Sequence, residues 1–574
     1  MNMINKHYKK LIIFILICIS FSFLFHSLTS NKPLSPDSSL LKSQTSLSTK
    51  ISTTTNQLSN SNQIITDFTI IKCNHLYSKN KCNNIPKSYI QLSPSLNYYH
   101  NSKIKNDYYL LIKLQSLDEA TKIITDISTN KKSLESESNE IEGFDYEIEE
   151  VQIDENSSLF KKKIIISNLK NPLNDNIPIL RSIDILFGNN DLIDSRLYHK
   201  TLHLSSSDSI HTILSLNMMN LKEQSILKES NQQLLNLKNE QIIEFSEEQQ
   251  PENDDGSKIR SKFKIMQLSD LHFGQDLGRC ETIIDPNDND NIDNEKCTSD
   301  LKTLKFIEDS INKESPDLIV ITGDLIDVDR SIDYKSILLK SLQPILAKNI
   351  KFIYTFGDEI DNYDTKLLII DFLSTLPNCL NTLPQDKSLY GVTNYNFQVR
   401  SKAFKQSASI TILDSQDHYL DESQINYLYR LNNEFQNDYK LIFFHYPLPQ
   451  FRPPGKFKII GTYNEKHALD SKTNVKFHDD IINCGYNVIA VGHEHENDAC
   501  ILSESSANKD KSIWLCYNSV TGDSGVTKLN KGYIRKLRLF EIDFDDGRLL
   551  SWKRKEVDKS AFDYQLIYDI PKPQ

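Results

Sequence analysis

The sequence lacks a surplus of positive charge. Its 66 lysine and arginine residues are outnumbered by 77 aspartate and glutamate residues, which gives a formal net charge of -11 at pH 7. Proteins that bind nucleic acid usually meet the phosphate backbone with a basic surface. The charge balance of this chain therefore argues against nucleic acid as a partner.

Long apolar runs are scarce too. The most continuous one, Leu11 to Phe25, follows Lys9 and Lys10 and is shorter than the roughly 20 residues that a membrane-spanning helix needs. A basic segment before an apolar run is typical of a targeting sequence. We interpret residues 11–28 as a signal-anchor or a cleaved signal peptide, two alternatives that stay open. Both predict the secretory pathway: a single-pass membrane protein with a luminal or extracellular main domain, or a secreted protein.

Cysteine is sparse, with nine residues in the chain of 574. Eight of them lie outside the apolar run, and this even number permits disulfides in an oxidising compartment. Their spacing does not match a zinc knuckle, and sequence alone leaves the connectivity open. The pairs that we would test first are Cys73 with Cys82, Cys280 with Cys297, and Cys500 with Cys516.

Composition divides the chain into segments. Strand-like runs at Tyr108–Leu114, Lys162–Ile166 and Ile177–Phe187 predict a small β-rich domain. Leucines at helical spacing over residues 216–248 predict an amphipathic helix. The predicted segments are a cytoplasmic N-terminus (1–10), the targeting segment (11–28), a disordered Ser/Thr/Asn-rich stalk (29–65), a β-rich N-terminal domain with a helical extension (66–250), a linker (251–262) and a C-terminal domain (263–570).

The C-terminal domain has the alternation of short apolar strands and helices that indicates an α/β fold. Five of its strands run into clusters of Asp, His or Gly. Ligands of α/β sheets bind at the carboxyl ends of strands, so these clusters are candidates for one common site. The clusters are Ser269-Asp270-Leu271-His272, Thr322-Gly323-Asp324, Gly357-Asp358-Glu359, His445 and Gly492-His493-Glu494-His495.

These residue types suit metal ions. Asp270 and His272 are two residues apart and can hold one ion from a single loop, and His493 and His495 repeat this spacing. Asp324 follows a glycine, which permits a tight turn toward the other ligands. Mixed imidazole and carboxylate ligands suit Zn, Fe or Mn rather than Ca. Two such cations, roughly 3.5–4 Å apart, can activate a water and hold phosphate oxygens for in-line displacement.

The ordered series resembles the calcineurin-like metallophosphoesterase superfamily over about residues 262–545. Ser269–Gly274, the Cys280–Cys297 insertion and Gly492–Asp498 resemble one subgroup, the fungal cell-cycle-linked phosphatases related to the plant proteins named purple acid phosphatase 29. The resemblance implies a four-layer α/β (α+β) sandwich of two mixed β-sheets flanked by helices, here preceded by the β-rich domain. It also implies a metal-dependent hydrolase that acts on phosphomonoesters, with phosphoproteins as candidate substrates.

The resemblance also assigns roles to single residues. Asp327 occupies the last position of the G-D-x-x-D motif. A purple enzyme has a tyrosine ligand there, so we predict no purple charge-transfer band for this chain. The implied metal ligands are Asp270, His272 and His495 for the first metal, Asp324 as the bridge, and His445 and His493 for the second metal.

Asp358 and Glu359 depart from the family pattern, which has Asn and His at these positions. Asp358 would replace the Asn ligand and add a negative charge facing the phosphate. Glu359 would replace the histidine that protonates the leaving group, and loss of a general acid slows a reaction by roughly 10²–10⁴. Two functions stay open: a phosphoesterase in which Asp358 and Glu359 hold the catalytic positions, and a catalytically weak binding or regulatory module. His418 and His467 are interpreted as surface or core residues.

Overall fold

The predicted segments map unevenly onto the structure, a computed structural model. The targeting segment 11–28 and nearly all of the predicted stalk lie outside the residues that the structure describes. The described residues are 62–74, 85–98, 106–130, 134, 145–151, 164–170, 176–204, 210–225, 242–244, 261–280, 298–401, 404–523, 533–557 and 560–571.

The predicted localisation is corrected. The assignment to a membrane or to the secretory pathway depended on the apolar run after Lys10. Among the described residues, no helix combines the length and the apolar character that a bilayer crossing requires. The membrane, signal-anchor and secretory assignments are therefore withdrawn.

The described residues of the N-terminal region form three antiparallel sheets of three strands, in the orders β1-β3-β2, β4-β6-β5 and β7-β9-β8. Their inward side chains, among them Phe68, Leu110, Leu180 and Leu214, form one buried core. The three strand predictions for this region are confirmed by β3, β6 and β7. The strands are β1 (Gln63–Asn74), β2 (Tyr89–Gln91), β3 (Asn106–Ser116), β4 (Lys122–Ser128), β5 (Asp145–Val151), β6 (Ile164–Lys170), β7 (Ile179–Gly188), β8 (His199–His203) and β9 (His211–Met219).

Two mixed sheets form the C-terminal domain. One has the order β13-β12-β11-β21-β22-β23, the other β10-β14-β15-β16-β18-β20-β19-β17. The strands of the first are β11 (Lys262–Leu268), β12 (Leu318–Thr322), β13 (Lys351–Thr355), β21 (Lys536–Asp543), β22 (Arg548–Lys555) and β23 (Ala561–Asp569). Those of the second are β10 (Ile242–Glu244), β14 (Tyr395–Arg400), β15 (Ser407–Ile412), β16 (Tyr439–Phe443), β17 (Ile459–Ile460), β18 (Val488–Val491), β19 (Cys500–Glu504) and β20 (Ser512–Tyr517).

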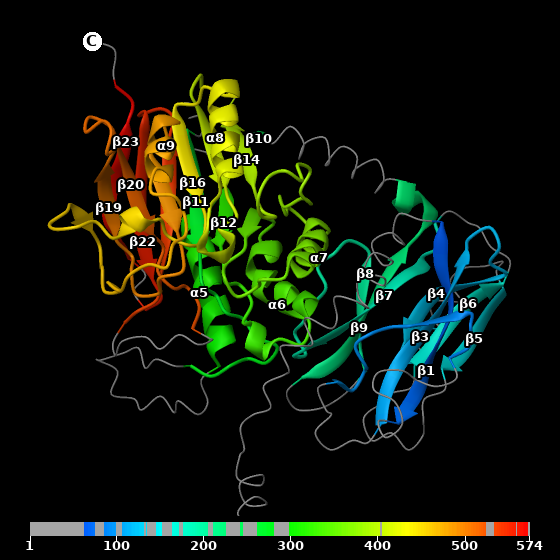
Figure 1. Cartoon of the computed structure of the whole chain (residues 1–574). Helices are drawn as coiled ribbons and strands as arrows, with labels where there is room; N and C mark the ends of the chain where they lie inside the picture. The colour runs from blue at the N-terminus through cyan, green and yellow to red at the C-terminus, as the bar shows by residue number, and fades with distance from the viewer. Residues whose placement is uncertain are drawn as a thin grey trace, which may run out of the picture.

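The sheets are packed face to face, with helices outside them. Side chains alternate along a strand, so Ile265 of β11 packs between the two sheets while Met266 packs toward the helices. On the far side of the second sheet, Ile442 and Ile489 pack against helices α8 and α9. The helices are α5 (Ser299–Glu314), α6 (Tyr334–Ala347) and α7 (Tyr363–Ser374) on the first sheet, and α8 (Glu422–Glu434) and α9 (Phe477–Asn483) on the second. The predicted four-layer sandwich is confirmed (Figure 1).

Strand polarity explains where the clusters meet. β11, β12 and β13 run parallel to one another, as do β15, β16, β18 and β20. Their carboxyl ends therefore share an edge of each sheet. Helices α6, α7 and α8 each begin with a residue whose side chain accepts a hydrogen bond from a backbone N–H of the first turn. Asp333 accepts from Ser336 N, Asn362 from Thr365 N and Asp421 from Ser423 N.

The helix predicted over residues 216–248 is wrong at both described ends. Its first residues complete β9, residues 221–225 form a short helical turn, and β10 occupies the far end. β10 pairs in parallel with β14 and buries Ile243. Pairing with a neighbouring strand thus decides the structure of Ile242–Glu244, since strand formation depends on cross-strand packing.

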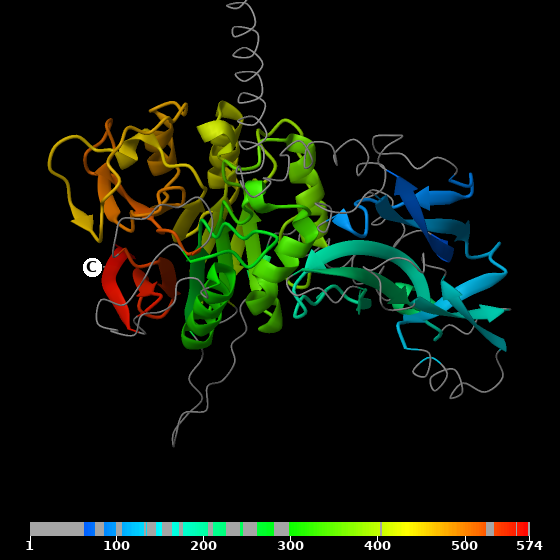
Figure 2. The ribbon, with the colours of Figure 1, turned by 90° about the horizontal axis from the view of Figure 1, so that it is seen from below.

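The N-terminal sheets lie beside α6 and α7, on the side of the domain away from β21–β23 (Figures 1 and 2). The contact is close: Phe187 N donates to Ser336 Oγ over 2.9 Å, and Leu186 joins the core that contains α6. The carbonyl of Phe187 also accepts a hydrogen bond from Gln275 Nε2. The two regions are therefore joined close to the loop that follows β11.

One predicted disulfide is confirmed. Cys500 and Cys516 are opposed on the neighbouring strands β19 and β20 and are bonded to each other. Cys73 and Cys280 each take part in a disulfide as well. Their predicted partners, Cys82 and Cys297, lie outside the described residues.

Candidate metal centre

The structure brings all seven predicted ligands together. They come from five separate segments, each at the carboxyl end of a strand: β11, β12, β13, β16 and β18. They form overlapping groups of three in which the potential ligand atoms lie within 4.8 Å of one another. The groups are Asp270, His272 and His495; Asp358, His445 and His493; and Asp270, Asp324 and His445. The shared Asp270 and His445 make this one site rather than two.

Backbone strain marks the site. Asp270, His272, Asp324 and His493 all have left-handed backbones, with φ of 55°, 46°, 46° and 67°. Residues other than glycine avoid this region, and such strain collects at functional sites. It is held by backbone hydrogen bonds between loops, such as His272 N to Asp324 O over 2.9 Å. The loops after β11 and β12 are therefore locked together.

Two glycines make room for this packing. A Cβ on Gly323, whose φ is 89°, would run into the His445 ring. A Cβ on Gly357 would run into the Asp324 carboxylate. Both positions therefore require glycine because the neighbouring ligand fills the space of a side chain.

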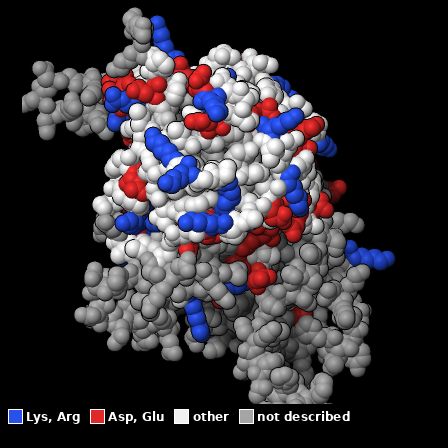
Figure 3. Space-filling view, turned by 60° about the vertical axis from the view of Figure 1, so that its left-hand side comes forward, with Lys and Arg blue, Asp and Glu red and all other residues white. Residues whose placement is uncertain are grey.

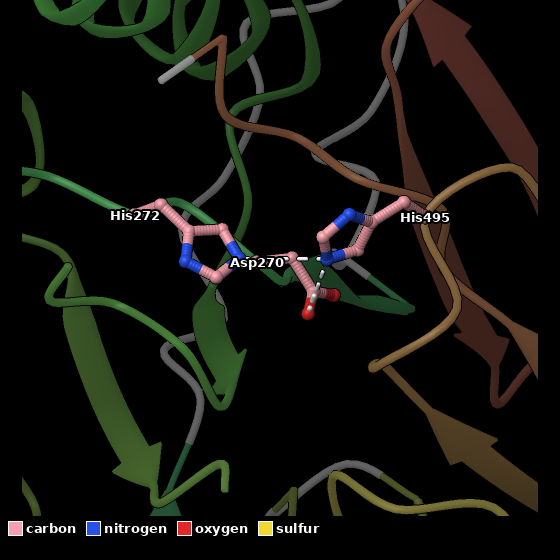
Figure 4. Close-up of side chains that lie close together, drawn as sticks. All are labelled: Asp270, His272 and His495. Carbon is pink, nitrogen blue, oxygen red and sulfur yellow. Dashed lines mark hydrogen bonds and ion pairs between the residues drawn. The ribbon is translucent and has the colours of Figure 1, made fainter. Parts of the chain in front are cut away.

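The first group turns three side chains toward one point (Figure 4). His495 Nε2 lies 3.4 Å from Asp270 Oδ1 and 3.4 Å from His272 Nε2. Asp270 and His272 are buried, whereas the His495 side chain is 22% exposed. Burial opposes ionisation of Asp270, but the polar contact with His495 and the charge of the nearby imidazoles outweigh it and lower the pKa of Asp270 to about 2.

The second group is arranged around His445. Its Nδ1 lies 2.9 Å from the carbonyl of Thr322, which favours the tautomer with Nε2 as an acceptor. That Nε2 is 3.1 Å from Asp358 Oδ1 and 3.4 Å from Asp324 Oδ2. Asp358 Oδ2 also lies 3.5 Å from His493 Nδ1. A backbone carbonyl behind a metal-binding histidine is the usual way to orient such a ligand.

Glu359 faces the first group rather than the second. Its Oε1 lies 2.7 Å from His272 Nδ1, and its Oε2 accepts from Val328 N over 3.2 Å. Burial opposes charge on the His272 ring, but the bond and charge of Glu359 outweigh it and raise the pKa of His272 to about 9. Burial, with Asp324 and Asp327 nearby, raises the pKa of Glu359. Glu359 thus orients His272, as an outer-shell carboxylate does for a metal-binding histidine.

Asp327 lies apart from these groups. Its Oδ2 accepts from Arg330 Nε over 2.6 Å, and its Oδ1 accepts from Asp329 N and Arg330 N. It caps the short 3₁₀ helix η2 (Val328–Arg330). An arginine thus already neutralises this carboxylate.

The donor set fits transition-metal cations. Asp270 Oδ1 is buried, and His495 Nε2, at 3.4 Å, is too far away for a good hydrogen bond. A buried acceptor in this position costs free energy unless a ligand satisfies it. Within the described chain, the ion pairs of Asp270, Asp324 and Asp358 are all with histidines and none is with lysine or arginine. Four imidazoles and three carboxylates with no permanent cation are a set that suits Zn, Fe or Mn.

Sequence reasoning missed His418. This residue ends η3 (Gln416–His418), which follows β15, a strand that no motif marks. Its Nε2 nevertheless lies 3.3 Å from Asp358 Oδ2. Two features of His418 are visible only in the structure. Its backbone is left-handed, with a φ of 60°, and its ring is stacked on that of Tyr446, the residue after His445. His467, interpreted in the same way, is exposed and lies 3.5 Å from Glu494 Oε1.

Charge on one face of the molecule does not single out a binding region. On the face drawn in Figure 3, blue basic side chains and red acidic ones are interspersed over the described part of the molecule. The buried ligands at the strand ends, rather than the charges on this face, mark the candidate site.

Comparison with known proteins agrees with this geometry. Residues 263–497 match the family model described as calcineurin-like phosphoesterase. Residues 263–497 of the chain therefore resemble a calcineurin-like phosphoesterase domain. The match includes every predicted ligand of the site.

Three curated relatives share this part of the chain. Protein SIA1 of Kluyveromyces lactis is 35% identical, and Phosphatase DCR2 of Saccharomyces cerevisiae is 31% identical. Each alignment covers 54% of this chain. It covers 51% of Protein SIA1 and 57% of Phosphatase DCR2, so the chain spans about half the length of these two proteins. "Probable inactive purple acid phosphatase 29" of Arabidopsis thaliana is 25% identical over 54% of this chain and 87% of its own length.

Proposed function

We propose that this protein is a metal-dependent phosphatase that hydrolyses phosphomonoesters at the site formed by β11, β12, β13, β16 and β18. The main support for the proposal is that two groups of three potential ligands lie side by side. A third group, Asp270, Asp324 and His445, connects them. Such an arrangement suits two cations that share a bridging carboxylate, and Asp324 is the candidate bridge. Two cations held there would lower the pKa of a bound water and polarise the phosphoryl oxygens.

The protein's own groups would do the remaining work. His445 and His272 are held from behind, by the Thr322 carbonyl and by Glu359, so that the Nε2 atom of each ring faces the other ligands. His493 and His495 are about a fifth exposed and form its open side. Substrate would therefore enter past these two histidines, while Asp270 and Asp324 form the closed floor.

The replacement of Asn and His by Asp358 and Glu359 sets limits on this activity. Asp358 contacts His445 and His493 and would act as a ligand that adds negative charge. Glu359 is engaged with His272 and cannot at the same time protonate a leaving group. We expect slow turnover of alkyl phosphates and faster turnover of aryl phosphates, because a phenolate leaves without a proton.

A second candidate is a metal-binding module with little or no catalysis. The observation that favours it is the engaged Glu359, and one relative is named as a probable inactive enzyme. Hydrolysis of para-nitrophenyl phosphate by the purified full chain with added Mn²⁺ or Zn²⁺ separates the two candidates. The phosphatase proposal expects activity that is lost in Asp270→Asn.

Two further measurements sharpen the test. Elemental analysis should find two transition-metal equivalents per chain, and an absence of bound metal would contradict both candidates. The double variant Asp358→Asn/Glu359→His restores the family residues and should raise turnover. Activity that survives Asp270→Asn would show that hydrolysis does not occur at this site. A phosphoserine peptide compared with the aryl ester tests phosphoproteins as the substrate class.

A further inference from the structure

An imidazole lies beside Asp358 that no motif of the sequence indicates. His418 Nε2 is 3.3 Å from Asp358 Oδ2, and the same oxygen lies 3.5 Å from His493 Nδ1. The ring centroids of His418 and His493 are 5.8 Å apart. His418 therefore reaches the second ligand group from β15, a strand that contributes no ligand.

The ring is held in place from several sides. It is stacked on Tyr446 with the two ring centroids 3.8 Å apart and an angle of 13° between the planes. The Tyr446 hydroxyl accepts from Asp470 N over 2.9 Å, and the His418 carbonyl accepts from Lys472 N over 3.0 Å. Asp417 and His418 both have left-handed backbones, with φ of 54° and 60°. Two consecutive strained residues persist only where the surroundings enforce them.

The position suits contact with a substrate better than metal ligation. His418 is absent from the groups of described residues whose ligand atoms lie within 4.8 Å of one another. Its side chain is 26% exposed, close to the exposure of His493 on the open side. At 3.3 Å the contact with Asp358 is longer than a usual N–H···O bond. The imidazole nitrogen can therefore serve a second partner at the mouth of the site.

We propose that His418 hydrogen-bonds a phosphoryl oxygen of the substrate and so supplies the imidazole contact that Glu359 cannot make. The inference rests on the proposed function, because it assigns the phosphate partner of that same site. Glu359 is turned to His272 on one side of the centre, and His418 brings an imidazole to the other side, against the additional carboxylate of Asp358.

The test measures phosphate binding rather than turnover. Inorganic phosphate is titrated calorimetrically into the full chain loaded with Mn²⁺, for the wild type and for His418→Ala, His418→Asn and His467→Ala. Loss of one hydrogen bond to a charged ligand should weaken binding about 10-fold or more in His418→Ala. His418→Asn keeps an N–H donor and should stay within about threefold of the wild type. His467→Ala, an exposed histidine of the same domain, should bind as the wild type does.

Metal content and thermal unfolding of each variant are measured in parallel. If His418→Ala binds phosphate as tightly as the wild type, or loses Mn²⁺ in step with phosphate, His418 only positions Asp358 and the inference is overturned. A wild type that binds no phosphate overturns it as well. Phosphate binding that depends on His418 without any hydrolysis of para-nitrophenyl phosphate supports the inference and contradicts the proposed catalysis.

Discussion

The two regions of the molecule bury carboxylates in different company. In the N-terminal region, Asp184 and Asp194 lie 2.7 and 2.6 Å from Arg196 Nη2, and Lys335 of α6 lies 2.5 Å from Asp184. Arg196 also stacks over the ring of Phe372, with 4.9 Å to its centroid. These cations are permanent at neutral pH, so the cluster is balanced within the protein.

The candidate metal centre lacks such permanent cations among the printed ion pairs of its described carboxylates. Asp270 and Asp358 face imidazoles, and an imidazole that binds a metal is neutral. Asp327, three residues from Asp324, is paired with Arg330 and takes no part in the ligand groups. The buried carboxylates Asp184 and Asp327 are thus neutralised by permanent cations, whereas Asp270 and Asp358 are surrounded by histidines.

The largest effect should come from breaking the centre at its shared carboxylate. We expect Asp324→Asn to lower hydrolysis of para-nitrophenyl phosphate about a thousandfold or more, since it weakens both cations at once. Elemental analysis should show fewer than two metals per chain. Asp327→Asn is the matched control and should keep both metals. If Asp327→Asn loses metal as Asp324→Asn does, the distinction drawn from Arg330 is wrong.

The N-terminal cluster should respond in stability rather than in activity. Asp184→Asn leaves Arg196 and Lys335 underpaired in a buried site, so we expect a loss of about 3–5 kcal/mol in the free energy of unfolding. Urea unfolding at pH 7 measures it, with Asp191→Asn, an exposed carboxylate nearby, as the control. Equal midpoints for the two variants would contradict a structural role for the cluster.

The free energy of unfolding should also depend on pH through Asp184. Burial opposes ionisation of Asp184, but Lys335 and Arg196 outweigh it and hold the pKa of Asp184 well below its usual value of 3.8. A depressed pKa stabilises the fold above the unfolded pKa and loses this contribution as the pH falls. Wild-type stability should therefore decline below about pH 4, and the decline should be shallower in Asp184→Asn.

A change at Glu359 tests the role of the imidazoles around the candidate metal centre, because Glu359 contacts His272. Because the pKa of His272 is raised to about 9, the metal-free site should hold a proton at pH 7.5 that a metal displaces. Metal affinity should then rise with pH up to about 9. Glu359→Gln should lower the pKa of His272 and reduce the protons released, as calorimetry in two buffers of different ionisation enthalpy detects. Loss of this orienting carboxylate should weaken metal binding roughly 10–100-fold.

The smallest effect should come from the link between the two regions. Gln275 donates to the Phe187 carbonyl and accepts from Ile332 N and Asp333 N over 3.1 and 3.2 Å. Gln275→Ala leaves these buried groups unpaired, so we expect about 1–2 kcal/mol less stability. Since Gln275 follows His272 by three residues, metal affinity should fall slightly as well. Unchanged metal affinity would show that the N-terminal region does not support the metal-binding loop.

Local pattern was sufficient for much of the fold. Apolar runs that end in Asp, His or Gly predict β11, β12, β13, β16 and β18, because burial on both faces of a parallel strand leaves a continuous apolar signature. The helix predicted over residues 216–248 fails at residues 216–219 and 242–244, which form strands, for the opposite reason. There the leucine spacing is local, while the pairing of β10 with β14 is decided more than 150 residues away.

The sequence by itself determined which side chains stand at the strand ends, because the apolar pattern and the ligand spacing both belong to neighbouring residues. Their role as metal ligands stays a prediction. Only the tertiary structure decided that Glu359 turns to His272 and that His418 reaches Asp358. These contacts depend on the close packing of loops from different strands, and packing between segments distant in the chain leaves no periodic trace in the sequence.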